Sequence, residues 1–410
     1  MNTSFKKVLL AVVCSSTLLF TACGGDDNNH QFIQERTYIS NAAYTQDSIQ
    51  GAVIRVMSYK MPNVADQKAE ATAMVFYPST PRPADGWRVV VWEHGTVGIG
   101  DECAPSVNTL NPRFKTMAES LLAEGYVIVA PDYEGLGSKG IHPYLHLESA
   151  AQSAIYAVRA LKDHLGSQMN GAWMSVGQSQ GGHASLGTAE FANQDPNYKG
   201  AVAAAPASSL GYIISEIAPE AIARLEMGEA YGMVPKGTAR NVYAELMAYA
   251  AYVAVGIKAY EPNFNYHDIF QEASQATVME AEGSNGENGK CLGDLMASFQ
   301  ADIDQFTQTT GKAVMEYPGL TANFQDNPII KQFLAINQPA TKKLDKPIMV
   351  IQGEADTAVP ADVTTALVEN LRTMGTVVDY QLVPLAGHTQ AIVERNAELV
   401  RFIKTNMPAQ

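Results

Sequence analysis

Short apolar runs alternate with amphipathic stretches along most of the chain, and this alternation predicts strands joined by helices. The apolar runs have the length of buried strands and end in Gly, Pro or polar residues. They lie at 69–77, 87–92, 126–130, 172–176, 201–205, 346–352 and 377–383. Helices are expected at 118–124 and at 147–165, where apolar residues fall on one face. We therefore expect parallel βαβ units with right-handed crossovers.

The alternation stops near residue 208, where helix-like segments follow one another without intervening strands. This second pattern continues to about residue 323. We expect 208–325 to be a helical lid inserted between two parts of one core, 41–207 and 326–410. The predicted fold class is therefore α/β, with a mostly parallel sheet, flanking helices and a large helical insertion.

The strand expected at 172–176 runs into Gly177, Gln178, Ser179, Gln180 and Gly181, which have the Gly-x-Ser-x-Gly form of a nucleophile elbow. A helix is expected directly afterwards, so the motif has the strand–turn–helix context that it requires. The glycines suit positions where strand and helix cross too closely for a Cβ atom. A serine in a Gly-rich turn is more often only a turn former, so the motif needs a base and an acid downstream.

Both partners follow at later strand ends. Asp356 comes after the strand expected at 346–352, and His388 comes after the strand expected at 377–383. The order Ser179, Asp356, His388 is that of the α/β-hydrolase fold. His388 would act as the general base for Ser179, and Asp356 would orient the imidazole and stabilise its charged form.

Each of these residues also has a simpler interpretation. An Asp after a strand is often a helix cap, and a His in a loop is often only solvated. Glu354 and Asp362 are rival acids close to Asp356 in the sequence. It is the combination of three strand ends in the correct order that favours catalysis.

The strand expected at 87–92 leads into His94, Gly95 and Thr96, where this fold directs one backbone N–H at the developing oxyanion. We expect Thr96 to supply that donor and Gln180, the residue after the nucleophile, to supply the second. The remaining histidines near the motifs have simpler structural roles as turn or core residues. They are His94, His142, His146, His164 and His183.

Three segments together resemble the secretory lipase family known best from yeasts. They are 177–182 (GQSQGG), 131–137 (PDYEGLG) and 103–106 (CAPS). The resemblance covers the chain from about Tyr38 to the C-terminus. It implies an α/β-hydrolase with a helical lid before the acid-bearing strand, the triad Ser179, Asp356 and His388, and a disulfide from Cys103 to a lid cysteine. The His-Gly-Thr loop departs from the yeast lipases and is closer to bacterial esterases.

The N-terminal segment has the features of an export signal. A positive stretch with Lys6 and Lys7 precedes the apolar run 8–20, and small residues lead into Cys23. We expect 1–22 to be a signal peptide, Cys23 to be the lipidation site of a bacterial lipoprotein, and 23–40 to be a flexible tether. The predicted location is lipid-anchored in the bacterial cell envelope, at the outer membrane or cell surface. The alternative is ordinary cleavage that leaves a free terminal cysteine.

Cysteine usage agrees with export. Cys14 lies in the expected signal and Cys23 is the expected anchor, which leaves Cys103 and Cys291. A remaining pair in an oxidising compartment favours a disulfide, and the alternative is two independent thiols. The sequence contains no CxxC or HExxH spacing, so we expect neither a metal nor another cofactor.

Composition is compatible with one large globular unit. The chain has 410 residues, of which 46% are hydrophobic and 17% charged. Its net charge is −14 and it has no basic stripe, which argues against a nucleic-acid partner. Neutral or weakly charged substrates fit this balance better than polyanions.

The predicted function is that of a secreted serine carboxylic-ester hydrolase of lipase or esterase type, with a place in lipid catabolism. It would form an acyl-enzyme on Ser179 from a small-molecule ester or lipid. A serine peptidase of the same fold is the alternative, although amide cleavage usually requires a charged anchor for a peptide terminus, and the sequence reveals none. A non-catalytic surface binding protein is the remaining possibility.

The predicted lid is rich in Tyr and Met, which suit an adaptable acyl-binding surface. The same residues could equally hold the helices of the lid together. They are Tyr212, Met227, Tyr231, Met233, Met247, Tyr249 and Tyr252.

Overall fold

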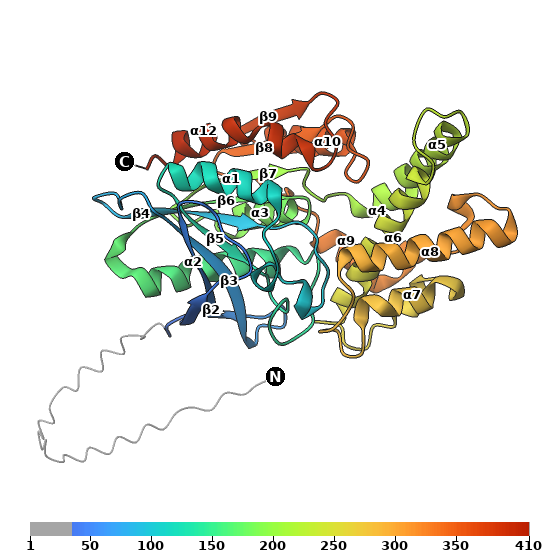
Figure 1. The fold of residues 1–410 in the computed structure, drawn as a ribbon, viewed down its shortest axis with the longest axis horizontal. Helices are drawn as coiled ribbons and strands as arrows, with labels where there is room; N and C mark the ends of the chain where they lie inside the picture. The colour runs from blue at the N-terminus through green and yellow to red at the C-terminus, as the bar shows by residue number, and fades with distance from the viewer. Residues whose placement is uncertain (1–34, 410) are drawn as a thin grey trace, which may run out of the picture. The chain divides into compact units, whose positions relative to one another are not determined.

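The computed structural model describes residues 35–409 (Figure 1). The expected signal peptide, the expected lipidation site Cys23 and most of the expected tether lie outside these residues. The first strand, β1 (Tyr38–Ala43), begins within the range expected for the tether and pairs antiparallel with β2 (Ala52–Pro62). Within the described part of the chain, no helix combines the length and the hydrophobicity that a membrane span requires.

One mixed sheet organises the described residues. Its strands run in the order β1-β2-β3-β5-β4-β6-β7-β8-β9. The strands after β2 are β3 (Lys68–Pro78), β4 (Trp87–Glu93), β5 (Val127–Pro131), β6 (Met169–Gln178), β7 (Tyr198–Ala204), β8 (Ile348–Gly353) and β9 (Val378–Val383). From β5 to β9 every neighbouring pair is parallel, whereas β1, β2 and β3 are antiparallel to their neighbours. The expected α/β fold with a mostly parallel sheet is confirmed.

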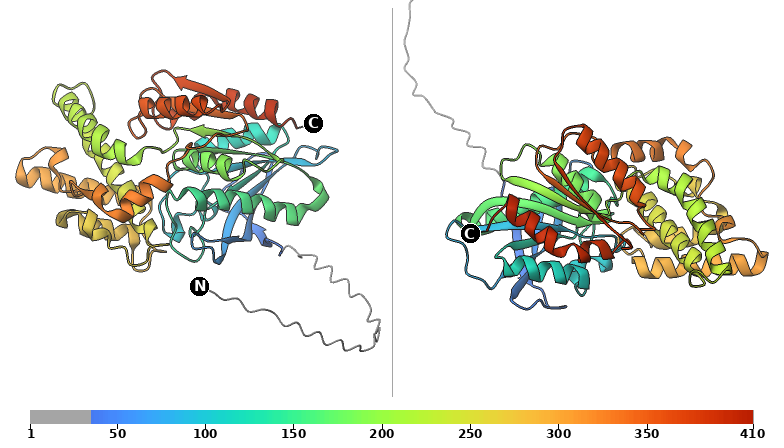
Figure 2. Two further views of the ribbon diagram at one scale, coloured as in Figure 1. Left: turned by 180° about the vertical axis from the view of Figure 1, so that it is seen from behind. Right: turned by 90° about the horizontal axis from the view of Figure 1, so that it is seen from above.

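Helices cover both faces of the sheet (Figure 2). Those on one face are α2 (Leu147–Leu165), α3 (Gln180–Phe191) and α10 (Ala361–Thr373). Those on the other face are α1 (Pro112–Ala123), α11 (Gln390–Glu394) and α12 (Asn396–Asn406). The central strands are apolar on both sides because both faces are covered: Val89 and Val91 pack with the first set, and Val90 packs with the second.

A group of helices lies between β7 and β8 in the sequence and beside the sheet in space (Figures 1 and 2). They are α4 (Leu210–Tyr212), α5 (Ala218–Ala230), α6 (Thr238–Ile257), α7 (Glu272–Glu282), α8 (Leu292–Thr310) and α9 (Pro328–Ile336). We call this group the lid. It has a hydrophobic core of its own, built mainly from α6, α7 and α8. Helix α9 lies beyond residue 325, where the lid was expected to end, yet its Ile330 and Phe333 are buried in the lid core.

Candidate active site

Ser179 occupies a sharp turn between β6 and α3. Its φ of 62° and ψ of −118° are rarely adopted by a residue with a side chain, so the local backbone is strained. A Cβ on Gly177 would lie 2.0 Å from the carbonyl oxygen of Gly181, and a Cβ on Gly181 would lie 1.8 Å from that of Glu93. Both positions therefore require glycine, and the turn has the geometry that the sequence motif predicts.

Asp356 and His388 come together from the loops after β8 and β9. The distance from His388 Nδ1 to Asp356 Oδ2 is 2.8 Å. Gln352 Nε2 also donates to Oδ2, at 3.1 Å, and the backbone N–H groups of Ala358 and Val359 donate to Oδ1, each at 2.9 Å. The Asp356 side chain is fully buried, and these donors fix its orientation toward the imidazole.

Ser179 and His388 line the same cavity, which has a volume of about 580 Å³. The carboxylate accepts from Nδ1, so the proton of a neutral imidazole is on Nδ1 and Nε2 carries the lone pair. His388 Nε2 is buried and makes no hydrogen bond with any residue between 35 and 409. The structure thus brings Ser179 and His388 to one cavity, with Asp356 bonded to His388, but without a Ser179–His388 hydrogen bond, a contact that often tightens only when substrate binds.

The rival acids do not occupy this position. Glu354 and Asp362 are both exposed, and neither side chain forms a hydrogen bond or ion pair with His388 among the described residues. The backbone places Glu354 at the end of β8, where its N–H donates to the carbonyl of Val383. Of the three acids considered, Asp356 is the one that contacts the imidazole.

The other histidines near the motifs lie in positions where a structural role is expected. Burial lowers the pKa of His142, His146 and His183 to about 4, so all three are neutral at pH 7. Burial also lowers the pKa of His94, whose ring nitrogens contact backbone carbonyls. His164 lies exposed on α2. Within 35–409, no group of His, Cys, Asp and Glu side chains is arranged to hold a metal ion.

Gln180, one of the two expected oxyanion donors, is the first residue of α3. The N–H of such a residue has no partner inside its own helix, so it is available to a ligand. The side-chain amide is held by His142: His142 Nδ1 lies 2.8 Å from the carbonyl oxygen of Glu134, and its Nε2 lies 3.0 Å from Gln180 Nε2. Because Nδ1 must donate to that carbonyl, Nε2 accepts from the amide. The sequence pattern did not reveal this contact.

Thr96, the other expected donor, lies in the loop after β4 and lines the 580 Å³ cavity together with Ser179. Its Oγ1 is 2.6 Å from the hydroxyl of Tyr144. Tyr144 is buried, and its ring lines a second cavity that also reaches Ser179. The Thr96–Tyr144 hydrogen bond therefore connects the loop that follows β4 to the wall of this second cavity.

The second cavity has a volume of about 100 Å³ and is almost entirely apolar. Its walls come mainly from the lid and include Leu246, Val253, Phe324, Ile330, Phe333 and Leu334. The Tyr and Met residues expected to form an acyl-binding surface contribute little to it. Tyr249 lines both cavities, whereas Met247 and Tyr252 are buried in the lid core.

The other four of those residues are exposed. Tyr212, Met227, Tyr231 and Met233 lie on or beside α4 and α5, and each exposes more than half of its surface. The apolar wall next to Ser179 is built instead from aliphatic and Phe side chains of α6, the segment before α9, and α9 itself.

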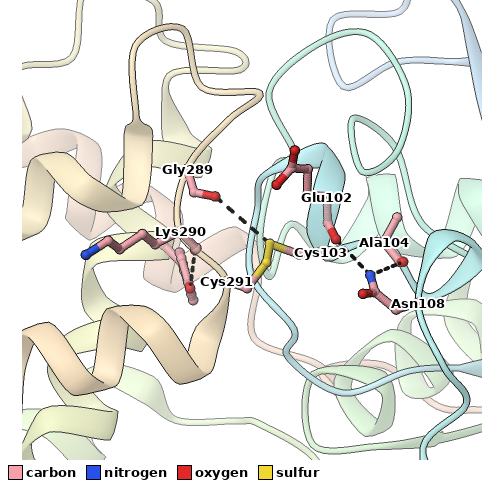
Figure 3. Close-up of a disulfide and its surroundings, with 8 residues drawn as sticks. Glu102, Cys103, Ala104, Asn108, Gly289, Lys290 and Cys291 are labelled. Carbon is pink, nitrogen blue, oxygen red and sulfur yellow. Dashed lines mark hydrogen bonds between the residues drawn. A yellow bond between two sulfur atoms is a disulfide. The ribbon is translucent and has the colours of Figure 1, made fainter.

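A disulfide joins the lid to the loop after β4 (Figure 3). Cys103 and Cys291 are bonded, and Cys291 directly precedes α8. Next to the bond, the N–H of Leu292 donates to the carbonyl of Val97 at 2.8 Å. The pairing expected from the sequence is therefore present, and it fixes the lid beside the loop that carries Thr96.

Comparisons with known proteins agree with the fold. The prolyl oligopeptidase family matches residues 299–409, a stretch that contains Asp356 and His388 but not Ser179. A comparison with curated proteins found no match.

Solved structures match most of the chain. The rice cell wall degrading esterase LipA from Xanthomonas oryzae is 18% identical, with a TM-score of 0.63, over 90% of this chain and 97% of that one. Lipase A from Candida antarctica in its closed state is 16% identical, with a TM-score of 0.66, over 90% of this chain and 81% of that one. The chain therefore has the α/β-hydrolase fold with a helical insertion, and the likeness to lipases that the sequence predicted is confirmed at the level of the fold.

Proposed function

We propose that this protein is a serine hydrolase that cleaves carboxylic esters. The observation that carries the proposal is the position of His388: its Nδ1 is bonded to buried Asp356 at 2.8 Å, and its ring faces the cavity that Ser179 lines. In this mechanism His388 Nε2 takes the proton of Ser179 as the hydroxyl attacks the ester carbonyl. It then gives the proton to the departing alcohol, and a water activated in the same way releases the acid.

The oxyanion of each tetrahedral intermediate would be held by the backbone N–H groups of Thr96 and Gln180. Loss of one such donor typically raises the barrier by about 2.7–4 kcal/mol. The strained turn at Ser179 and the helix start at Gln180 support this assignment, because an N–H in the first turn of a helix has no partner inside that helix.

The two cavities at Ser179 suggest how an ester would lie. The apolar cavity of about 100 Å³ suits the acyl chain, and the larger cavity of about 580 Å³, which has polar residues in its wall, suits the alcohol. The small apolar volume favours short acyl chains over long ones. The substrate is therefore a small ester or a lipid with a short acyl group, as in enzymes of esterase type.

A direct test is hydrolysis of a 4-nitrophenyl ester series from acetyl to palmitoyl, by the wild type and by Ser179→Ala. We expect a maximum at short chains and loss of at least a thousandfold in kcat/KM for Ser179→Ala, with an unchanged circular dichroism spectrum. Activity of the variant close to that of the wild type would refute Ser179 as the nucleophile.

The alternative of a serine peptidase has one observation in its favour, the match of residues 299–409 to the prolyl oligopeptidase family. A short peptide 4-nitroanilide, assayed beside the esters, separates the two functions. We expect the ratio of kcat/KM for the ester to kcat/KM for the amide to exceed the ratio of their uncatalysed hydrolysis rates. The reverse order would identify a peptidase.

We also propose export and lipid attachment through Cys23. The N-terminal pattern supports this location, and the Cys103–Cys291 disulfide is a bond typical of oxidising compartments. Incorporation of a labelled fatty acid into the protein expressed in a bacterium, and its loss in Cys23→Ala, tests the anchor. Equal labelling of both proteins would contradict it.

A further inference from the structure

An arginine in the larger cavity has no anionic partner. Arg113, at the start of α1, lines the cavity with Ser179 and His388. It is partly buried, and desolvation of its guanidinium lowers its pKa. No carboxylate among residues 35–409 forms an ion pair with it, and its side chain donates no hydrogen bond there. A partly desolvated guanidinium without a protein partner is available to an anionic ligand that enters the cavity.

Three other arginines in the described part of the chain are paired with carboxylates, whereas arginines such as Arg55 and Arg401 have no ion pair but are exposed to water. Arg88 is paired with Asp85, Arg224 with Glu220 and Arg240 with Asp304. Acidic residues are in excess, since the net charge is −14, so carboxylates are not scarce. Arg113 differs from these exposed arginines because it is partly buried and lines the cavity with Ser179 and His388.

The surroundings of Arg113 fit a polar ligand. Asn111, which precedes α1, lines the same cavity, and its side chain accepts a hydrogen bond from the Arg113 backbone N–H at 2.9 Å. On the lid side the cavity is lined by Glu245, whose carboxylate accepts from Tyr249 Oη at 2.5 Å and forms no ion pair with Arg113. The cavity thus presents one unpaired cation on the α1 side and one carboxylate on the lid side.

We propose that Arg113 binds an anionic group, a carboxylate or a phosphate, on the alcohol part of the ester. This inference rests on the proposed ester hydrolysis, with the acyl chain in the apolar cavity and the alcohol in the larger one. A guanidinium can hold either anion through two parallel N–H donors, which gives selectivity as well as affinity. Arg113 is then a specificity-determining residue that distinguishes anionic leaving groups from neutral ones.

The test compares two chromogenic esters that differ in one charge. They are 3-butanoyloxy-4-nitrobenzoic acid and its methyl ester, which release closely related nitrophenolates. The measured quantity is the ratio of kcat/KM for the acid to kcat/KM for the methyl ester. Comparison of this ratio between variants removes the intrinsic reactivity of the two esters.

We expect Arg113→Gln to lower the ratio about tenfold, because a charge-assisted contact with the leaving group is lost. Arg113→Lys should retain part of the ratio because it keeps the charge. The matched control is Arg55→Gln, which removes the same charge from an exposed position on β2 and should leave the ratio unchanged. High salt should lower the wild-type ratio, since a partly exposed ion pair is screened.

The outcomes separate the two claims. Suppose that the wild type hydrolyses both esters, but that the acid-to-methyl-ester ratio is the same in wild type and Arg113→Gln and does not change with salt. This result would overturn the anion site alone. Failure to hydrolyse either ester would overturn the proposed function and the anion site with it. If Arg113→Gln does not fold, Arg113→Lys and the salt dependence of the wild type decide the question.

A second pair of substrates distinguishes the two anions. Butanoyl esters of glycerol and of glycerol 3-phosphate are compared by titration of the butanoic acid released. If the wild type prefers the glycerol 3-phosphate ester and Arg113→Gln does not, the anion is a phosphate. If the wild type prefers only the benzoic acid ester, the anion is a carboxylate. Absence of a preference in both pairs contradicts the proposal.

Discussion

The core and the lid contribute to the site in different ways. In the proposed mechanism the core supplies the reacting groups from three strand ends, where the backbone fixes them: the turn at Ser179 is held by two glycines that no other residue can replace without a clash. The lid supplies the apolar wall from side chains of several helices, none of which depends on one special backbone conformation. In the proposed function, backbone geometry thus determines the reaction, and side-chain packing that tolerates change determines the choice of acyl chain.

The largest expected effect lies in the core. Asp356→Asn should lower kcat about 10⁴-fold, because an amide at this position stabilises the wrong imidazole tautomer. Glu354→Gln and Asp362→Asn are matched controls, since both acids are exposed and do not contact His388, and each should change kcat less than about threefold. Assay with 4-nitrophenyl butanoate measures all three. A larger loss in either control than in Asp356→Asn would reassign the acid.

The connection between the two regions comes next. Replacement of both cysteines, Cys103→Ser with Cys291→Ser, should lower the free energy of unfolding by about 2–5 kcal/mol, because the bond closes a loop of 188 residues. Urea denaturation measures this loss. The same loss on reduction of the wild type, and no further loss on reduction of the double variant, would confirm its origin. An unchanged midpoint would show that the lid is held by its other contacts.

A lid substitution should change selectivity rather than the reaction. Val253→Trp fills the apolar cavity and should lower kcat/KM for octanoyl esters relative to acetyl esters. The expected change corresponds to an activation barrier about 1–3 kcal/mol higher for the octanoyl ester. Met233→Trp, at an exposed position, is the control and should leave the chain-length profile unchanged. Equal loss for every chain length would mean that the acyl chain lies elsewhere.

The smallest expected effect concerns the positioning of Gln180. His142→Phe removes the acceptor of the Gln180 side-chain amide and should lower kcat about tenfold, with little change in KM, because the oxyanion donor is less well placed. His146→Asn is the control: His146 is partly buried and caps α2, a role that Asn can take over, and this variant should preserve kcat. A change in KM alone would point to substrate binding instead.

The sequence predicted the core of the fold well because the relevant signals are local. Central strands buried on both faces appear as apolar runs, and the residues that follow them are read directly, as with Asp356 and His388. Strands β1 and β2 were not predicted, since they lie at the edge of the sheet, where exposed residues such as Val53 and Arg55 flank a buried one, Ile54.

The lid and the cavity walls were predicted only in outline. Helical spacing indicated helices, but it did not indicate that Met227 and Met233 would be exposed while Phe333 of α9 would line the cavity. The contact of His142 with Gln180 joins residues far apart in the chain. Such contacts leave no periodic signal in one sequence.

The central claim is that His388 activates Ser179, and covalent labelling tests it most directly. A fluorophosphonate probe should add once per chain, on the peptide that contains Ser179, as measured by mass spectrometry. His388→Ala should be labelled at least a thousandfold more slowly, because the serine then lacks its base. Labelling at another residue, or at the same rate in His388→Ala and wild type, would contradict the account.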